Sequence, residues 1–173
     1  MLKSQIKGRA WVFGDNVTTD EILPSKWKTK FIAKEDFAKY AFEPLRPEIY
    51  SNMQEGDMIV GGKNFGFGSS REQAALAIIG LGVQILIAES FARIFYRNCI
   101  NVGIYPIEGI TTDGFISDMD NVSVDFSAFR ITNNKSGKSV TFTPLPKFME
   151  SIVQDGGLIE FAKGNSGNLY YFK

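Results

Sequence analysis

The stretch GKNFGFGSSREQA, residues 62–74, places three glycines, two serines and an arginine directly before a run of helix-forming residues. A glycine-rich turn that enters a helix exposes unpaired amides and the positive end of the helix dipole, and both attract an anion. The Arg71 guanidinium adds a planar fork that binds a carboxylate through two hydrogen bonds. The stretch therefore predicts an anion-binding loop in which Ser69 and Ser70 lie beside the ligand.

The same stretch also has a purely structural interpretation as a helix cap. Ser69 with Glu72, or Ser70 with Gln73, has the spacing of a capping box, in which each side chain satisfies the other residue's backbone amide. Two better-known phosphate loops are excluded. The Walker A lysine is missing, and Arg71 stands where a dinucleotide-binding loop has its third glycine.

A second polar stretch, GDNVTTDEILP at residues 14–24, also follows a predicted strand. Taken alone, it is typical of a turn in which Asp15, Asn16 and the threonines satisfy backbone groups. Two such stretches on one small chain, each placed after a strand, favour a shared site over two unrelated turns.

The elements that must position these loops follow from the apolar pattern of the first two thirds of the chain. Strands are predicted at residues 7–13, 57–61 and 83–88, and helices at 35–42, from Ser69 or Ser70 to about Gly80, and at 90–99. The order strand, loop, helix, strand, helix favours a right-handed βαβ unit with parallel strands.

The last third of the chain changes character. It predicts short strands at residues 122–126, 129–132 and 139–143 and a helix after Pro146. The predicted fold class is therefore α/β with an added antiparallel portion. It forms one domain at residues 1–163, followed by a tail at 164–173.

The composition excludes several partners and chemistries. Nineteen basic residues balance nineteen acidic ones, so the zero net charge gives no footprint for nucleic acid or for an anionic membrane. The absence of histidine removes histidine-based triads and imidazole metal ligands. The single cysteine, Cys99, cannot supply the shell of an iron–sulfur cluster and fits a reducing compartment. Because the N-terminus lacks the apolar core of a signal peptide, the chain is expected in the cytoplasm.

Four segments of the sequence resemble motifs of the aconitase superfamily's swivelling domain. They occur in that family's order and span roughly Gly8 to Phe161, and the chain has the length of the free-standing small subunits of the superfamily's dehydratases. The segments are GDNVTTDEILP, GKNFGFGSSREQA, ESFARIFYRNCINVGIYPI and GGLIEF.

The resemblance implies a swivelling β/β/α three-layer fold, as in the aconitase C-terminal domain. It also implies that the chain closes over a large subunit, which carries a [4Fe–4S] cluster on three cysteines, so that this chain itself binds no cofactor or metal. The implied reaction is that of a hydro-lyase of leucine biosynthesis, which interconverts 2-isopropylmalate and 3-isopropylmalate through isopropylmaleate. In the family, the open iron of the cluster acts as a Lewis acid on the leaving hydroxyl.

The resemblance also assigns roles to individual residues. Ser69 matches the serine that, as an alkoxide, removes a proton in the dehydration step. Ser70 matches a neighbour that helps to bind the substrate, and Arg71 matches the arginine that binds a substrate carboxylate. Asp20 matches an active-site carboxylate of the family. Two residues depart from the family pattern, because Phe67 stands where cysteine is frequent and Gln73 where histidine is usual.

Substrate choice is left open by the sequence. In the family, the residues that follow the first motif contact the variable part of the substrate, and here they are SKWKTK at residues 25–30. Trp27 offers an apolar wall for an isopropyl group, whereas Lys28 and Lys30 suit an additional carboxylate, as in homoaconitate. The alternatives are therefore a subunit of homoaconitase or of another 2-hydroxy-diacid dehydratase, and a non-catalytic module that only binds carboxylates.

Overall fold

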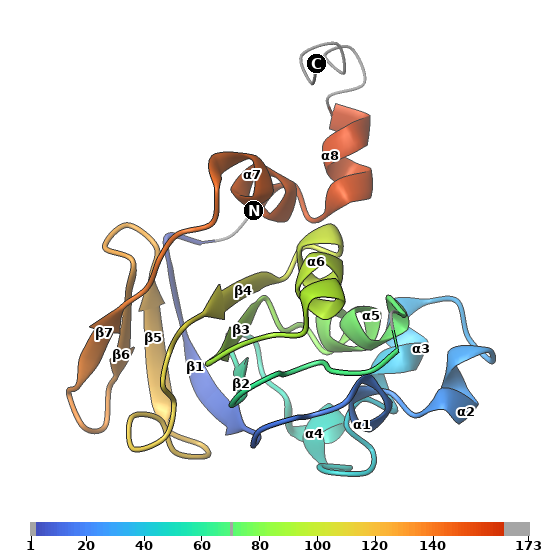
Figure 1. Cartoon of the computed structure of the whole chain (residues 1–173), viewed down its shortest axis with the longest axis horizontal. Coiled ribbons are helices and arrows are strands. Elements are labelled where there is room, and N and C mark those ends of the chain that lie inside the picture. Colours follow the sequence, from blue (N-terminus) through green and yellow to red (C-terminus); the bar gives the residue numbers. More distant parts are fainter. Residues whose placement is uncertain (1–2, 70, 165–173) are drawn as a thin grey trace.

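The computed structural model describes residues 3–69 and 71–164 of the chain (Figure 1). Seven strands form one curled sheet in the order β4-β3-β2-β1-β5-β6-β7. The strands are β1 (Gln5–Val12), β2 (Met58–Val60), β3 (Ile85–Ala88), β4 (Tyr105–Glu108), β5 (Asn121–Asp125), β6 (Arg130–Asn133) and β7 (Ser139–Thr141). The helices are α1 (Thr19–Ile22), α2 (Ser25–Lys28), α3 (Lys34–Ala38), α4 (Ile49–Asn52), α5 (Gln73–Gly80), α6 (Arg93–Asn101), α7 (Lys147–Gln154) and α8 (Leu158–Gly164).

One half of the sheet is parallel, as the sequence predicts. β1 pairs with β2, β2 with β3 and β3 with β4, all in parallel register. Helix α5 connects β2 to β3 and helix α6 connects β3 to β4, so the predicted βαβ arrangement is confirmed and extended by one unit. The carboxyl ends of β1, β2 and β3 consequently lie at one edge of the sheet, the edge at which ligands usually bind in such folds.

The other half of the sheet is antiparallel, and β1 belongs to both halves. β1 pairs with β5 in the register Ile6↔Val124, and β6 and β7 continue the antiparallel ladder. The predicted antiparallel strands in the last third are therefore confirmed. The helix expected after Pro146 is α7, whose N-cap is Pro146.

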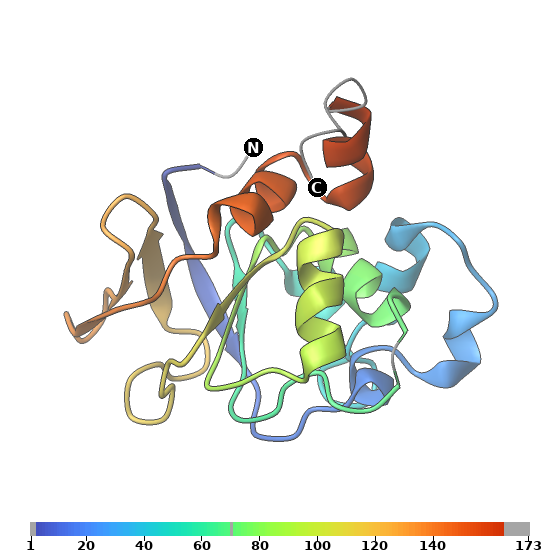
Figure 2. The same ribbon diagram turned by 45° about the horizontal axis from the view of Figure 1, so that its top comes forward.

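The buried side chains of the parallel strands face two separate cores. On β2, Ile59 packs into a core shared with helices α1, α3, α5 and α6. Its neighbours Met58 and Val60 point to the opposite face and belong to a second core, which includes Val124 of β5 and Ile131 of β6. This alternation is the ordinary two-residue period of a strand. It produces three layers, a helical layer and two sheet layers, in agreement with the predicted β/β/α class (Figures 1 and 2).

The predicted helix at residues 35–42 is shorter than expected. Helix α3 ends at Ala38, and Phe42 adopts a left-handed backbone with φ 55°. Its amide donates to the Ile22 carbonyl at 2.8 Å, and its ring stacks on Phe13 at 4.4 Å between centroids. A left-handed backbone costs a residue other than glycine about 1–2 kcal/mol. The contacts of Phe42 with the segment after β1 outweigh this cost.

A buried carboxylate ties the start of β2 to the middle of β1. Asp57 is 4% exposed and accepts hydrogen bonds from the Arg9 amide (2.9 Å), the Arg9 guanidinium (2.6 Å) and the Trp11 indole (3.0 Å). Burial by itself would raise the pKa of Asp57, but these hydrogen bonds outweigh it and lower the pKa below its ordinary value. The carboxylate is therefore held as an anion at the amino end of β2, where it fixes β2 to β1.

Replacing Asp57 by asparagine is expected to lower the free energy of unfolding by about 3 kcal/mol, because an amide turned toward these donors leaves some of them unsatisfied. A group whose folded pKa is depressed stabilises the fold above its unfolded pKa, and that stability is lost as the pH falls through the folded pKa. Urea unfolding should therefore show a wild-type advantage at neutral pH that disappears well below pH 3.8, the ordinary pKa of an aspartate. The matched control is Asp113→Asn, on an exposed loop. An equal effect of the two substitutions would contradict the assignment.

Within residues 3–69 and 71–164, no helix has both the length and the apolar character needed to cross a bilayer.

Candidate functional site

The loops after β1 and β2 are joined by their main chains along the carboxyl edge of the sheet. The Asn16 amide donates to the Lys63 carbonyl at 2.7 Å, and the Thr19 amide donates to the Phe67 carbonyl at 2.8 Å. Both loops run side by side in the two views of the ribbon, next to α1 (Figures 1 and 2). The two polar stretches singled out in the sequence therefore lie at one place, as a shared site requires.

The loop after β3 holds the glycine-rich loop from its other side. The Phe65 amide donates to the Ser90 carbonyl, and the Ala92 amide donates to the Phe65 carbonyl, both at 2.9 Å. Gly66 has φ 79°, and a Cβ built on it would lie 2.1 Å from the Phe95 ring of α6. Only glycine fits a left-handed residue in such close contact. The position of the loop against α6 is thus fixed before any ligand arrives.

Asp20 lies on α1, whose start is set by a capping box. The Thr18 hydroxyl accepts from the Glu21 amide, and the Glu21 carboxylate accepts from the Thr18 amide at 2.7 Å. Asp20 follows in the first turn with its side chain 60% exposed at the site. This capping box was missed in the sequence, although its Thr-x-x-Glu signature is present at residues 18–21.

Two donors converge on a single oxygen of Asp20. The Lys28 ammonium lies 2.6 Å and the Ser25 hydroxyl 2.7 Å from Asp20 Oδ1. The hydrogen bond from Lys28, then that from Ser25, lowers the pKa of Asp20, and the charge of Arg71 lowers it further. Asp20 is therefore ionised at neutral pH and lies within electrostatic reach of Arg71, which connects the two predicted loops chemically.

The glycine-rich loop presents its polar side chains at the surface. Ser69 is half-buried and Arg71 is exposed, and no ion pair joins Arg71 to another residue in the described ranges. Ser70 lies outside the described residues. Of the four residues predicted to form the anion site, the structure thus describes Ser69, Arg71 and Asp20 and brings their two loops together.

The predicted capping box of Ser69 with Glu72 is wrong. Helix α5 begins at Gln73, with Glu72 as its N-cap, and Glu72 makes no side-chain hydrogen bond to the helix. The loop reaches the helix later than the pattern suggests because its main chain is bonded to the neighbouring loops up to Phe67. The second capping option involves Ser70 and falls on a residue that is not described. The first-turn amides of α5 are left without a cap from Ser69 or Glu72, which suits an anion.

Thr19 is a buried polar residue that lies beside the glycine-rich loop. Sequence reasoning did not single out Thr19. It is 2% exposed, and its hydroxyl has no hydrogen-bond partner in the described part of the chain. A Cβ built on Gly68, which has φ 116°, would lie 3.3 Å from this hydroxyl. A buried hydroxyl without a hydrogen bond costs about 1–3 kcal/mol. A polar ligand atom that reached the Thr19 hydroxyl would supply the missing hydrogen bond.

The segment expected to contact the variable part of the substrate is the short helix α2. Trp27 is half-buried, its ring stacks on Tyr40 at 3.8 Å between centroids, and its indole donates to Glu43 at 2.8 Å. Lys28 is buried against Asp20, whereas Lys30 is exposed with its ammonium 4.7 Å from the centre of the Trp27 ring. The two lysines, which look alike in the sequence, thus have different environments.

The described residues contain no cluster of three or more histidine, cysteine or acidic side chains arranged to hold a metal ion. Cys99, the single cysteine of the sequence, is buried in α6. Burial raises the pKa of its thiol well above the ordinary value, which disfavours the thiolate that an iron–sulfur cluster requires. The described residues therefore do not fit an iron–sulfur cluster.

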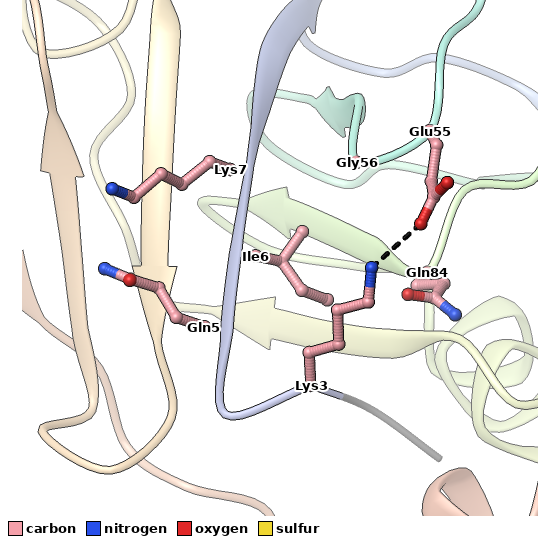
Figure 3. A pocket seen from close by; sticks show the side chains of 7 residues that line it. All are labelled: Lys3, Gln5, Ile6, Lys7, Glu55, Gly56 and Gln84. Atoms are coloured by element: carbon pink, nitrogen blue, oxygen red, sulfur yellow. Dashed lines mark hydrogen bonds and ion pairs between the residues drawn. The ribbon is translucent and has the colours of Figure 1, made fainter.

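A separate pocket of about 290 Å³ lies at the opposite, amino ends of the parallel strands (Figure 3). Figure 3 shows Lys3 and Glu55 on one side of it, joined by an ion pair of 2.9 Å. Both side chains are highly exposed, at 71% and 88%, so their interaction is screened by solvent. None of the described residues that line this pocket carries a hydroxyl.

Comparisons with known proteins agree with this geometry. Residues 14–111 match the aconitase C-terminal domain family. The 3-isopropylmalate dehydratase small subunit of Methanosarcina mazei is 48% identical over 158 residues, which cover 91% of this chain and 96% of the relative. The methanogen homoaconitase small subunit of Methanothermobacter thermautotrophicus is 46% identical over 154 residues, covering 89% and 88%.

A solved structure gives the same result for the fold. The crystal structure of 3-isopropylmalate dehydratase (leuD) from Methanocaldococcus jannaschii has a TM-score of 0.88 and 37% sequence identity, covering 98% of this chain and 99% of that one. The resemblance read from the four motifs is therefore confirmed, together with the fold class. The loops at the carboxyl edge fall inside the matched residues, and this chain belongs to the aconitase C-terminal domain family.

Proposed function

We propose that this chain is the small subunit of a hydro-lyase that interconverts 2-isopropylmalate and 3-isopropylmalate in the cytoplasm, as a step of leucine biosynthesis. Support comes from relatives at 41–48% identity that are named 3-isopropylmalate dehydratase small subunits. In this proposal residues 1–163 form one swivelling domain, and residues 164–173 are a tail outside it.

The observation that carries the proposal is the joining of the Asp20 loop to the Ser69 loop at the carboxyl edge of the sheet. The Thr19 amide, next to Asp20, donates to the carbonyl of Phe67, two residues before Ser69. A carboxylate, a hydroxyl and the exposed Arg71 guanidinium are thereby held on one short stretch of surface. Such a surface is half of a site for a small anionic substrate, because it offers binding and proton transfer but no Lewis acid.

The chemical roles follow from the residue types. Arg71 binds a substrate carboxylate through its fork, and Ser70 assists in substrate binding. Ser69 removes the proton from the carbon next to the one that loses its hydroxyl. Its alkoxide is stabilised by the guanidinium and by the first-turn amides of α5. Asp20, held as an anion, contributes an acceptor on the facing side of the site.

The partner in this proposal is a large subunit with a [4Fe–4S] cluster, which supplies the Lewis-acid chemistry for the leaving hydroxyl. This chain supplies the deprotonating serine and the carboxylate-binding arginine. It is therefore expected to bind substrate weakly and to turn over nothing by itself.

The second candidate substrate is a homoaconitate-type acid, which carries one more carboxylate. Two observations favour it as the alternative: the relative named methanogen homoaconitase small subunit, and the exposed Lys30, two residues after the end of α2. In the same proposal Lys28 and Lys30 are the candidate ligands of that extra carboxylate. A non-catalytic carboxylate-binding module is the remaining alternative.

Anaerobic co-expression with a cluster-bearing large subunit tests the function. The pair is expected to convert 2-isopropylmalate, while either chain alone shows no turnover. A panel of 2-isopropylmalate, homocitrate and citramalate-type acids then ranks the substrates by kcat/KM. Preference for homocitrate would replace the first substrate by the second. Carboxylate binding by the lone chain, together with no turnover by the pair on any acid of the panel, would favour the non-catalytic module.

A further inference from the structure

The Lys28 side chain is a buried ammonium at the edge of the site. The residue is 5% exposed and its side chain 1% exposed. Moving an ammonium out of water is costly unless an opposite charge lies close to it. In the described ranges the counter-charge is Asp20, whose Oδ1 lies 2.6 Å from the Lys28 nitrogen. The pair is unequal, because the Asp20 side chain is 60% exposed.

Neighbouring contacts fix the backbone that carries Lys28. The adjacent Trp27 stacks on Tyr40 and donates to Glu43 at 2.8 Å, and Lys26 forms an ion pair with Glu43 at 3.1 Å. These contacts attach α2 to the segment that follows α3. Turning the ammonium toward a ligand would therefore break its ion pair with Asp20 without help from a shift of the helix backbone.

The hydrogen bonds leave the two oxygens of Asp20 in different environments. Lys28 and Ser25 both donate to Oδ1, at 2.6 and 2.7 Å. Oδ2 accepts no hydrogen bond from a side chain or amide of the described residues, and the carboxylate is mostly exposed. One oxygen is thus anchored to the protein, while the other has no such partner in the described residues, and the mostly exposed carboxylate lies within electrostatic reach of Arg71.

We propose that Lys28 is a positioning residue, which acts through Asp20: its buried ammonium holds the carboxylate ionised and oriented so that Oδ2 meets the substrate or the partner's half of the site. The ammonium itself does not bind a substrate carboxylate. This assignment rests on the proposed function only for its activity readout, and it replaces the role of carboxylate ligand considered for Lys28 under that proposed function. Specificity for an additional carboxylate would then depend on the exposed Lys30.

The direct test follows the titration of Asp20 by carbonyl NMR in the full chain without partner. Lys28→Met keeps the length and apolar contacts of the side chain but removes the charge, so the pKa of Asp20 is expected to rise. Ser25→Ala, which removes the second donor, should raise it less. The matched control is Lys30→Met, because Lys30 is exposed over Trp27 and, among the described residues, forms no hydrogen bond or ion pair with Asp20. This variant should leave the titration unchanged.

A stability cycle gives a second readout that does not depend on Lys28→Met being active. Asp20→Asn leaves the buried ammonium without its counter-charge and is expected to lower Tm by at least about 5 °C. Adding Lys28→Met to Asp20→Asn should restore most of that loss, since the unpaired charge is then gone. Equal losses in the single and double variants would overturn the pairing on which the proposal stands.

In the assembled enzyme, Lys28→Met is expected to lower kcat by at least about tenfold, with KM changed by less than about twofold. The acid limb of the kcat–pH profile of this variant should also move to higher pH, together with the pKa of Asp20. An unchanged Asp20 titration, or a selective rise in KM for the acid with an extra carboxylate, would overturn the proposal and make Lys28 a direct ligand. Failure of the wild-type pair to turn over any acid would instead reject the proposed function, and the titration and the stability cycle would still decide the role of Lys28.

Discussion

Replacing Ser69 by alanine is expected to lower kcat of the assembled pair by about a thousandfold or more, because a general base contributes about 10²–10⁴ to the rate of proton transfer. The hydroxyl is half-buried on a loop whose frame is made of main-chain hydrogen bonds, so its loss leaves the loop in place. KM should change little, since carboxylate binding is assigned to Arg71. Steady-state kinetics on 2-isopropylmalate, with gel filtration to verify assembly, measure the effect.

The control for this substitution is Ser151→Ala, at an exposed position of α7, where the hydroxyl donates to the Lys147 carbonyl of its own helix. It should retain full activity. Solvent exchange at the substrate carbon adds a direct readout, because Ser69→Ala is expected to abolish the exchange. Exchange at the wild-type rate by the alanine variant would show that another group is the base.

Replacing Arg71 by leucine is expected to reduce kcat/KM by about a thousandfold, mainly through KM, because a bidentate guanidinium–carboxylate pair is lost in a desolvated site. Arg71 is exposed in the lone subunit, so stability should change by less than about 0.5 kcal/mol. Arg71→Lys keeps the charge but not the fork, and an intermediate loss of about 10- to 100-fold is expected.

Arg130→Leu, on β6 in the antiparallel half, is the matched control because Arg130 is also exposed but lies in a different layer. It should leave both kinetic constants unchanged. A loss in kcat alone for Arg71→Leu, without a rise in KM, would contradict a role in substrate binding. The Asp20 titration offers a further check, because the Arg71 charge contributes to the lowered pKa of that carboxyl.

The strands of the parallel half could be predicted because they are short apolar runs bounded by polar loops. Strand β4 was missed, since Pro106 in its centre argues against a strand. The structure explains the exception: β4 is the outermost strand on one side of the sheet, and proline is tolerated in an outermost strand. Helices α1, α2 and α4 span only four residues each, too few for an apolar period to be visible.

The site was predictable to the extent that its chemistry is written in residue types. Ser69 and Arg71 lie in the loop after β2, and Asp20 lies in the segment after β1, on α1; parallel strands bring such segments to one edge. Lys28 was not predictable in the same way. Its burial depends on the stacking of Trp27 on Tyr40, a contact between two separate helical segments. Nothing in the local sequence distinguishes Lys28 from the exposed Lys30.

The loops after β1 and β2 are joined by hydrogen bonds between their main chains. The Phe67 carbonyl accepts from the Thr19 amide, and the Phe67 amide donates to the Val17 carbonyl, while the residue remains 49% exposed. Because the main chain of residue 67 is hydrogen-bonded and its side chain is largely exposed, phenylalanine in place of cysteine at this position is compatible with the same loop conformation. A substitution at residue 67 is therefore expected to leave intact the main-chain hydrogen bonds that keep the serine and aspartate loops together.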